Sequence, residues 1–291
     1  MKTGFIGLGN IGAPMARRLC VAPFDLMVFD VDREAARAFA GLDCRVADSV
    51  ADVTRHAEVV SVCVRDDVQL RSVLQGEGGL LGAAVGPVIV LVHSTVRPST
   101  VRDLASAAAA RGVALLDAPV TGGAHLAERG ELCAMVGGPA SSLQRVRPVL
   151  DAFCSSVLHA GPLGAGMVLK AANNLVTMLE LVAAHESTRL VQAGGVDEDL
   201  LRQVMTGNGN LTDTMRRFLE LRRDGARQLG AAAFESFQTR MGRLVTKDLE
   251  VALDIAAESG LELPATRTAS RLMMDVFLNR DSGTEEGSSA R

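Results

Sequence analysis

The sequence contains no tyrosine and no tryptophan. These absences exclude oxidoreductases that protonate a carbonyl with a catalytic tyrosine. A proton donor must therefore be Lys, His, Asp, Glu or Cys, or a water molecule held by one of them. Lysine is also scarce: of the 30 Lys and Arg residues, only Lys2, Lys170 and Lys247 are lysines. A buried lysine, unlike arginine, can lose its proton, which makes Lys170 in "GAGMVLKAANN" a candidate for proton transfer. A snorkelling surface lysine is the alternative.

Cysteine usage points to a reducing compartment. The five cysteines are scattered, odd in number and form no CxxC pair. This pattern is typical of a cytoplasmic protein without disulfides or structural zinc, so we expect no metal site. We find no uncharged apolar run of about 18 residues and expect no membrane span. The early glycines of "GFIGLGNIG" argue against a signal peptide.

Charge and composition are those of an ordinary globular protein. The net charge of -4 and the absence of a Lys/Arg-rich run give no basic field for nucleic acid. A length of 291 residues, 48% of them hydrophobic, predicts one or two domains.

The first 160 residues alternate short apolar runs with helical segments. The runs are "TGFIGL", "DLMVFD", "EVVSVCV", "PVIVLVH", "VALLD", "CAMVG" and "SVLHA". Strands that are apolar on both faces and alternate with helices predict a mostly parallel sheet covered by helices on both sides.

The character changes after "HAGPLGAG", where the pattern becomes continuously helical. We predict one long helix over 166–194, then helices over 197–206, 212–223, a segment ending near Ser259, and 264–278, with no further strand. The predicted domains are 1–161, which binds a dinucleotide, and 162–280, which is helical and serves substrate binding and oligomerisation. The polar tail 281–291 is expected to be disordered.

A glycine-rich motif lies between the first predicted strand and the first predicted helix. Its glycines, Gly7-x-Gly9-x-x-Gly12, allow a tight turn, close approach of a pyrophosphate and tight helix packing. The motif alone is a weak signal, but its place in the first β-turn-α unit strengthens it. The predicted cofactor-binding residues here are Gly7, Leu8, Gly9, Asn10, Ile11 and Gly12.

Asp30 ends the second predicted strand, 18 residues after Gly12. A carboxylate there accepts hydrogen bonds from the adenosine ribose and repels a 2′-phosphate, and Asp32 adds to that repulsion. The expected cofactor is therefore NAD rather than NADP, although Arg33 could reach a phosphate. The alternative is that Asp30 caps the next helix.

Two further stretches carry polar groups that suit a small carboxylate substrate. In "DAPVTGG", which follows the fifth apolar run, the Thr121 hydroxyl and the N–H groups of Gly122 and Gly123 would suit a carboxylate. A plain tight turn is the alternative. On the long helix, Lys170, Asn173, Asn174 and Thr177 share one face at i, i+3, i+4 and i+7. That face lines a cleft or is solvated.

Taken together, the chain resembles the β-hydroxyacid dehydrogenase family, which includes 3-hydroxyisobutyrate dehydrogenase and tartronate semialdehyde reductase. The resemblance runs from Gly4 to about Leu278, through "GFIGLGNIGAPMA", "DAPVTGG", "GAGMVLKAANN" and "KDLEVAL" in family order. It implies a Rossmann domain, a long helix joining it to a smaller all-α C-terminal domain, and a homodimer or homotetramer.

The resemblance also implies roles for individual residues. Lys170 matches the catalytic lysine, Asn174 an asparagine that orients the substrate, and Thr121 to Gly123 the segment that holds its carboxylate. Four more positions match cofactor contacts: Thr95, Lys247, and the pair Val64 and Arg65.

The sequence departs from the family at three places. Thr121 stands where many members have Ser, and its extra methyl trims the pocket. His93 stands where an acidic residue or Asn is common. The pair Val64-Arg65 replaces a usual Leu-Pro, which puts the path of that loop in doubt.

These features predict a hydride transfer between a short 3-hydroxy acid and its semialdehyde, with Lys170 as general acid and base. Three histidines, His93, His125 and His159, offer a rival acid, but none has a paired carboxylate at helical spacing. An imine reductase or a non-catalytic dinucleotide-binding module of the same fold is the alternative function. Separately, Arg240, Arg243 and Lys247 at i, i+3 and i+7 hold a second anionic group or form a solvated stripe.

Overall fold

The protein divides into two compact units, Met1–Lys170 and Ala171–Arg291. The computed structural model describes residues 1–21 and 23–280, so the predicted tail lies outside the described residues. The domain boundary expected at 161/162 stays a prediction. The long helix α9 (Ala165–Ala193) runs across the division between the two units.

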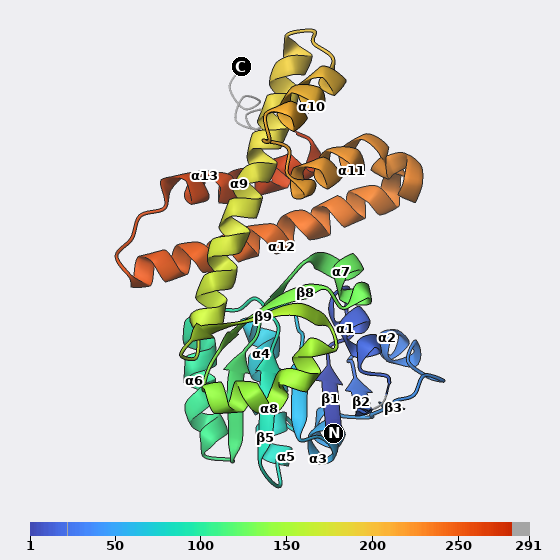
Figure 1. The fold of residues 1–291 in the computed structure, drawn as a ribbon, viewed down its shortest axis with the longest axis vertical. Coiled ribbons are helices and arrows are strands. Elements are labelled where there is room, and N and C mark those ends of the chain that lie inside the picture. The colour runs from blue at the N-terminus through green and yellow to red at the C-terminus, as the bar shows by residue number, and fades with distance from the viewer. Residues whose placement is uncertain (22, 281–291) are drawn as a thin grey trace, which may run out of the picture. The chain divides into compact units, whose positions relative to one another are not determined.

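A single twisted sheet organises the first unit. Among the described residues it has nine strands in the order β3-β2-β1-β4-β5-β6-β8-β7, with β9 beside β8 (Figure 1). All neighbouring pairs are parallel except β6 with β8 and β7 with β8. The strands are β1 (Lys2–Ile6), β2 (Asp25–Phe29), β3 (Arg45–Val46), β4 (Val59–Val62), β5 (Val88–Val92), β6 (Val113–Asp117), β7 (Val120–Thr121), β8 (Leu132–Gly137) and β9 (Cys154–Gly161).

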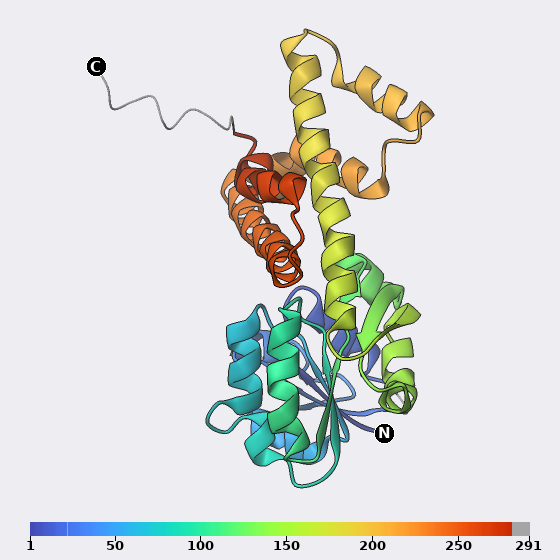
Figure 2. The ribbon, with the colours of Figure 1, turned by 90° about the vertical axis from the view of Figure 1, so that its left-hand side faces the viewer.

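Helices cover both faces of this sheet and bury two separate apolar cores. One core packs α1, α2, α7 and α8 around Phe5, Phe39 and Phe153; the other packs α3, α4, α5 and α6 against side chains such as Val90 and Leu104. The two layers lie on opposite sides of the sheet in Figure 2. Double-sided burial explains why the strands read as continuous apolar runs. The helices are α1 (Gly12–Arg18), α2 (Arg33–Arg37), α3 (Val50–His56), α4 (Asp67–Gln75), α5 (Leu80–Ala83), α6 (Pro98–Ala109), α7 (Gly123–Arg129) and α8 (Ala140–Asp151).

The expected architecture is confirmed for this unit: all seven predicted apolar runs contain strands. The two strands missed, β3 and β7, have two residues each. Such short segments show no periodicity from which a strand can be predicted.

In its described residues, the second unit consists of helices joined by turns and contains no strand. Four helices follow α9: α10 (Glu198–Gly207), α11 (Asp213–Leu229), α12 (Ala231–Glu258) and α13 (Pro264–Leu278). Side-chain caps fix two of the starts, because Asp197 accepts from the Asp199 N–H and Thr212 from the Met215 N–H. Their core contains Phe218, Met273 and Phe277.

The predicted helices agree with these bounds, apart from α11. It runs past Arg223 to Leu229, because Gly225 does not break it. A Cβ at Gly225 would collide with the ring of Phe234. The absence of a side chain at Gly225 therefore allows α11 to pack closely on α12. A glycine in a helical pattern can thus serve packing and need not end the helix.

Candidate functional site

The predicted cofactor residues of the first unit follow the carboxyl ends of neighbouring parallel strands. The glycine motif follows β1, Asp30 follows β2, Val64 and Arg65 follow β4, and Thr95 follows β5. Since these strands pair in parallel, their carboxyl ends meet at one edge of the sheet. That edge is where ligands bind in open α/β sheets.

The glycine-rich loop has room for a ligand at one position and none at the other two. Gly7 has a φ of +97°, and a Cβ on it would collide with the Cys63 carbonyl oxygen. A Cβ on Gly12 would collide with the Gly7 carbonyl oxygen. Gly9 is exposed, and a Cβ there would meet nothing within 4 Å. Gly7 and Gly12 are thus required by the turn itself, and Gly9 leaves the open approach that a pyrophosphate needs.

Asp30 closes this loop from the second strand. Its Oδ2 accepts from the Leu8 N–H at 2.5 Å and its Oδ1 from the Asp32 N–H at 2.8 Å. The alternative in which Asp30 caps the next helix is wrong, because Asp32 caps α2 by accepting from the Glu34 N–H. Asp30 instead holds a carboxylate beside the glycine-rich loop.

A hydrogen bond joins the turn after β4 to the turn after β5. Ser94 Oγ accepts from the Val64 N–H at 2.8 Å, and Gln69 Oε1 accepts from the Arg65 N–H at 3.0 Å. A proline at position 65 could not donate this second bond. The loop after β4, which lacks the usual proline, is therefore held by the hydrogen bond from the Arg65 N–H to Gln69, which a proline could not make. Thr95, the next residue after Ser94, is half-buried.

The turn predicted to hold a carboxylate requires glycine. Gly122 has a φ of +130° and Gly123 a φ of +76°, values that residues with a side chain rarely adopt. A Cβ on Gly122 would lie 3.0 Å from Leu126 and Leu132 side-chain carbons. Thr121, on β7, is half-buried. The tight-turn interpretation describes this backbone correctly and is compatible with carboxylate binding.

Helix α9 buries two of its polar residues and exposes several apolar ones. Lys170 is 8% exposed and Asn174, one turn later, is 6% exposed. Val168, Leu169 and Val176 are 43%, 40% and 57% exposed. An amphipathic surface helix shows the reverse pattern. Asn173 is exposed and Thr177 half-buried, so the predicted four-residue polar face is buried only at Lys170 and Asn174.

Within the second unit, α12 holds Asn174 in place. Asp248 Oδ2 accepts from Asn174 Nδ2 at 2.8 Å, and Asp248 is 7% exposed. Its other oxygen makes no hydrogen bond of regular geometry, but Lys247 Nζ lies 2.9 Å away as an ion pair. The Asn174 amide nitrogen thus donates to Asp248, and its carbonyl oxygen accepts from Asn173 Nδ2 at 3.4 Å.

Asp117, at the end of β6, is a second buried carboxylate. Its two oxygens accept from the N–H groups of Gly164 and Met167 at 2.7 and 2.8 Å. Burial raises the pKa of the Asp117 carboxyl, and the N–H groups of Gly164 and Met167 act in the opposite direction.

His93, one of the rival acids, is occupied by structural contacts. Its Nδ1 lies 2.8 Å from the Ala118 carbonyl oxygen and its Nε2 3.1 Å from Ser61 Oγ. Phe5 stacks on the ring and Phe153 meets its edge. Burial lowers the pKa of His93 to about 4, so the imidazole is neutral near pH 7. His159 Nε2 lies 2.8 Å from the Gly138 carbonyl oxygen, and His125 lies on α7.

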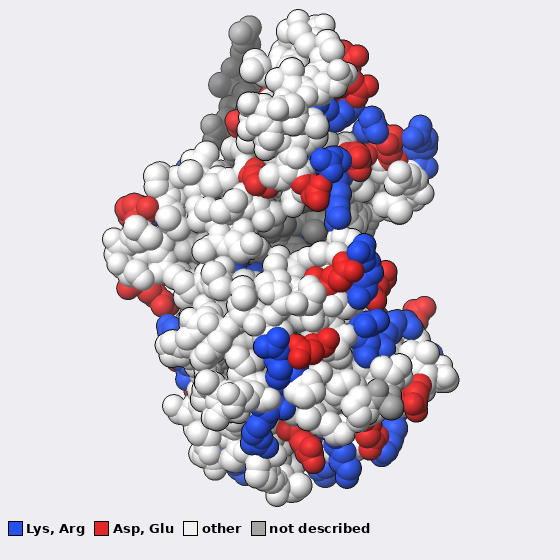
Figure 3. Space-filling view, viewed as in Figure 1, with Lys and Arg blue, Asp and Glu red and all other residues white. Residues whose placement is uncertain are grey.

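The basic stripe on α12 is solvated at two of its three members. Arg240 and Arg243 are exposed, and Lys247 is half-buried beside Asp248. On the face shown in Figure 3, basic and acidic side chains lie beside one another and do not separate by sign.

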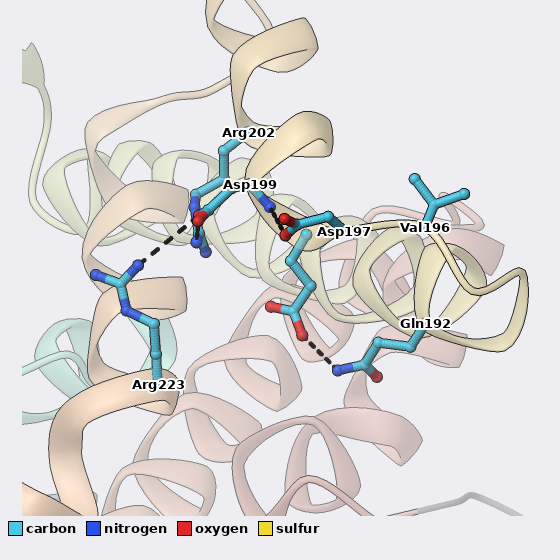
Figure 4. Close-up of a pocket in the computed structure, with 7 residues that line it drawn as sticks. Gln192, Val196, Asp197, Asp199, Arg202 and Arg223 are labelled. Atoms are coloured by element: carbon cyan, nitrogen blue, oxygen red, sulfur yellow. Dashed lines mark hydrogen bonds and ion pairs between the residues drawn. The ribbon is translucent and has the colours of Figure 1, made fainter.

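A pocket of about 400 Å³ in the second unit is lined by none of the predicted residues. Its charged side chains pair with one another, as Figure 4 shows. Arg202 pairs with Asp199, and Gln192 Nε2 donates to Glu198 at 2.5 Å. The full lining is Gln192, Val196, Asp197, Glu198, Asp199, Arg202 and Arg223. We assign it no function, because its polar groups are already paired.

Two further features of the described residues bear on other functions. In residues 1–21 and 23–280, no three His, Cys, Asp or Glu side chains gather as a metal site would require. Within the same residues, α9 is the one helix that is long and apolar enough to cross a membrane, by length and composition only. Helices of globular proteins also meet that test, so it is weak support for a span.

Sequence reasoning missed Ser94, Asp117 and Asp248 as members of the polar network. A carboxylate at the end of an all-apolar strand was a usable signal for Asp117. For Asp248 the signal was an acidic residue among apolar neighbours in "KDLEVAL". The bonding partners of these three residues are 30 to 74 residues away in sequence, beyond any spacing rule.

Comparison with known proteins agrees with this geometry. Residues 2–161 match the NAD-binding domain of 6-phosphogluconate dehydrogenase, and residues 164–290 match the NAD-binding domain of NADP-dependent 3-hydroxyisobutyrate dehydrogenase. An uncharacterised oxidoreductase of Mycobacterium tuberculosis is 37% identical over 268 residues, 92% of this chain and 90% of the relative. An NAD-dependent L-serine dehydrogenase of Pseudomonas aeruginosa is 33% identical over 90% of this chain and 88% of its own.

A solved structure extends the likeness to three dimensions. The 3-hydroxyisobutyrate dehydrogenase of Mycobacterium tuberculosis, solved with L-serine, superimposes with a TM-score of 0.80 at 27% identity. The match covers 96% of this chain and 98% of that one. The chain therefore belongs to the β-hydroxyacid dehydrogenase family and is an NAD-dependent oxidoreductase.

Proposed function

We propose that the protein interconverts a short 3-hydroxy acid and its semialdehyde, with Lys170 as the general acid and base. The observation that carries this proposal is the inverted burial on α9. Lys170 and Asn174 are buried, and Val168, Leu169 and Val176 are left exposed on the same helix. A buried lysine can lose its proton, which an arginine does not, and a buried amide lies one turn later on the same helix, so the pair suits proton transfer to a bound substrate.

The residues at the sheet edge fit a dinucleotide. The open space at Gly9 admits a pyrophosphate, and the Asp30 carboxylate suits ribose hydroxyls and disfavours a 2′-phosphate. NAD, when bound, supplies the acceptor or donor of the hydride. The remaining proposed contacts follow the family resemblance: Val64, Arg65, Thr95 and Lys247.

The turn after β7 suits the substrate carboxylate. In this proposal the Thr121 hydroxyl and the N–H groups of Gly122 and Gly123 donate to it. Successive N–H groups in an unusual backbone conformation form an anion-binding concavity, and both glycines have positive φ. Thr121 carries a methyl that a serine lacks, so the proposal favours substrates with a small group at that end.

Lys170 then moves one proton per turnover. During reduction its ammonium donates to the carbonyl oxygen, and during oxidation the neutral amine takes the proton of the hydroxyl. Asp248 occupies the Asn174 amide nitrogen. The Asn174 carbonyl oxygen accepts a long hydrogen bond from Asn173 Nδ2 at 3.4 Å and retains a second lone pair. That oxygen can accept from the substrate hydroxyl or from the lysine, which orients the reacting group.

We also propose that the protein is a cytoplasmic homodimer or homotetramer that binds neither nucleic acid nor membrane. The described cysteines are all free thiols, as a reducing compartment favours. Helices α9 and α10 each expose apolar side chains: Leu190 is 73% and Val204 67% exposed. Cell fractionation tests the location, and recovery with membranes would contradict it.

The test is NADH oxidation by purified protein with a panel of short semialdehydes: methylmalonate, tartronate, succinate, malonate and glyoxylate types. Lys170→Ala is assayed in parallel. A substrate-dependent signal that is lost in the variant supports the proposal and ranks the substrates. Silence across the panel with intact NADH binding contradicts it, and turnover of an imine would then identify an imine reductase. NADH binding without any turnover would indicate a non-catalytic module.

A further inference from the structure

Asp117 is a fully buried carboxylate that the proposed reaction does not use. It is 0% exposed and is the last residue of β6, opposite Gly137 of β8. A carboxylate without contact with water must be compensated by hydrogen bonds. The groups that donate these hydrogen bonds indicate the role of Asp117.

Those partners are backbone N–H groups at the start of α9. Gly164 donates to Oδ1 at 2.7 Å and Met167 donates to Oδ2 at 2.8 Å. The first N–H groups of a helix have no partner within it, and the helix dipole favours a negative charge beside them. Asp117 therefore does for α9 what an N-cap residue does, but from a strand 47 to 50 residues earlier in the sequence.

Two glycines, Gly137 and Gly166, pack closely against the Asp117 carboxylate. A Cβ on Gly137 would collide with Asp117 Oδ1. A Cβ on Gly166 would come 2.8 Å from Asp117 Oδ2 and would collide with the Met135 carbonyl oxygen. Close packing on both oxygens leaves the first turn of α9 little freedom to shift against β6 and β8.

Asp117 stands between two parts of the proposed reaction centre. It is the first residue of "DAPVTGG", four positions before Thr121. Met167, which it binds, precedes Lys170 by three residues, close to one helical turn. One carboxylate thus joins the strand end that leads into the substrate-carboxylate turn to the helix that carries the lysine, all within Met1–Lys170.

We infer that Asp117 is a positioning residue that sets the place of the Lys170 side chain relative to the turn Thr121–Gly123. This inference rests on the proposed function, because it acts through Lys170. A displacement of about 1 Å in a reacting group can cost on the order of 100-fold in rate. Loss of the carboxylate should therefore reduce kcat without removing a group that contacts substrate or cofactor.

The test is a double-mutant cycle of Asp117→Asn and Lys170→Ala. Asn keeps the shape but turns an N–H donor toward one of the two backbone N–H groups. We expect Asp117→Asn to lower kcat on the order of 10- to 100-fold in the presence of Lys170, with the Kd for NADH within about twofold. In the Lys170→Ala background it should cause no further loss, because the group that it positions is gone.

Two controls separate positioning from a general loss of stability. Val146→Ala removes methyl groups from the fully buried core under α8 and should lower stability while leaving kcat unchanged. If Asp117→Asn does not fold, Asp117→Ser takes its place, because the smaller serine keeps one hydroxyl acceptor for the backbone N–H groups, and it should show the same dependence on Lys170.

The outcomes are distinguishable. An Asp117→Asn enzyme with wild-type kcat, or one that loses the same factor with and without Lys170, overturns the positioning role. Full activity of Lys170→Ala overturns the proposed function itself, before Asp117 is considered.

Discussion

His93 is a buried histidine whose contacts give it a structural role and leave it no part in proton transfer. Both of its ring nitrogens have partners, the Ala118 carbonyl oxygen and Ser61 Oγ, and its pKa is lowered to about 4 by burial. At this position the family often has an acidic residue or asparagine. Here the imidazole packs between Phe5 and Phe153 and ties β5 to β4 and to the residue after β6.

This burial predicts acid sensitivity. The ordinary pKa of 6.5 is lowered to about 4 in the folded protein, so the unfolded chain binds the extra proton between these values. The contribution of His93 to the free energy of unfolding is therefore fully present above about pH 6.5 and is lost as the pH falls toward 4. Between about pH 7.5 and about pH 5, His93 accounts for a loss of about 2 kcal/mol.

Urea unfolding of wild type and His93→Gln at both pH values checks this. The variant should lose about 2 kcal/mol less between the two pH values. Burial also lowers the pKa of His185, in the second unit, to about 4. That histidine should cause the acid sensitivity that the variant retains. Equal losses in wild type and variant would show that His93 titrates normally.

At the scale of elements, the sequence predicted most of the fold and fewer of the contacts within it. The strands that line the nucleotide edge are apolar on both faces, so β1, β2, β4, β5 and β6 could be placed from composition alone. Strands β3 and β7 could not, since two residues carry no pattern.

The contacts at the site were harder to predict. The glycine-rich loop could be located, but the Asp30 bond to its Leu8 N–H joins residues 22 apart. Asp117 and the N–H groups that it binds at the start of α9 are likewise far apart in sequence, by 47 and 50 residues. Local patterns identify which residues are polar and where they fall on an element, whereas partners across the sheet depend on tertiary packing.

The glycine-rich loop itself gives a prediction. At Gly9 a Cβ would meet nothing within 4 Å, so Gly9→Ala should leave the melting temperature of the free protein unchanged. If the pyrophosphate occupies that space, the added methyl should weaken NADH binding by about tenfold or more. Fluorescence titration of NADH measures the Kd.

Gly86→Ala is the matched control. It also meets nothing within 4 Å but lies outside the motif, and both stability and NADH affinity should be unchanged. Wild-type affinity in Gly9→Ala would mean that the dinucleotide does not pass over this position.

At the scale of the whole molecule, the exposed apolar side chains predict self-association. Leu190, Leu200 and Val204, on α9 and α10, are 73%, 53% and 67% exposed, and their burial against a second copy would remove this apolar area from water. Light scattering should give at least twice the chain mass of 30.5 kDa. Leu190→Glu should lower the mass, and Val85→Glu, an 84% exposed position in the first unit, should not. A wild-type monomer at micromolar concentration would contradict the expectation.

The central claim is that Lys170 transfers the proton, and the most direct measurement is kcat of Lys170→Arg with the best semialdehyde of the panel. Arginine keeps the positive charge and a similar length but does not release a proton. The account predicts a loss of at least about 100-fold in kcat, with the Kd for NADH unchanged. Turnover near that of the wild type would show that a charge, and not a proton, is needed at this position, and would refute Lys170 as the general acid and base.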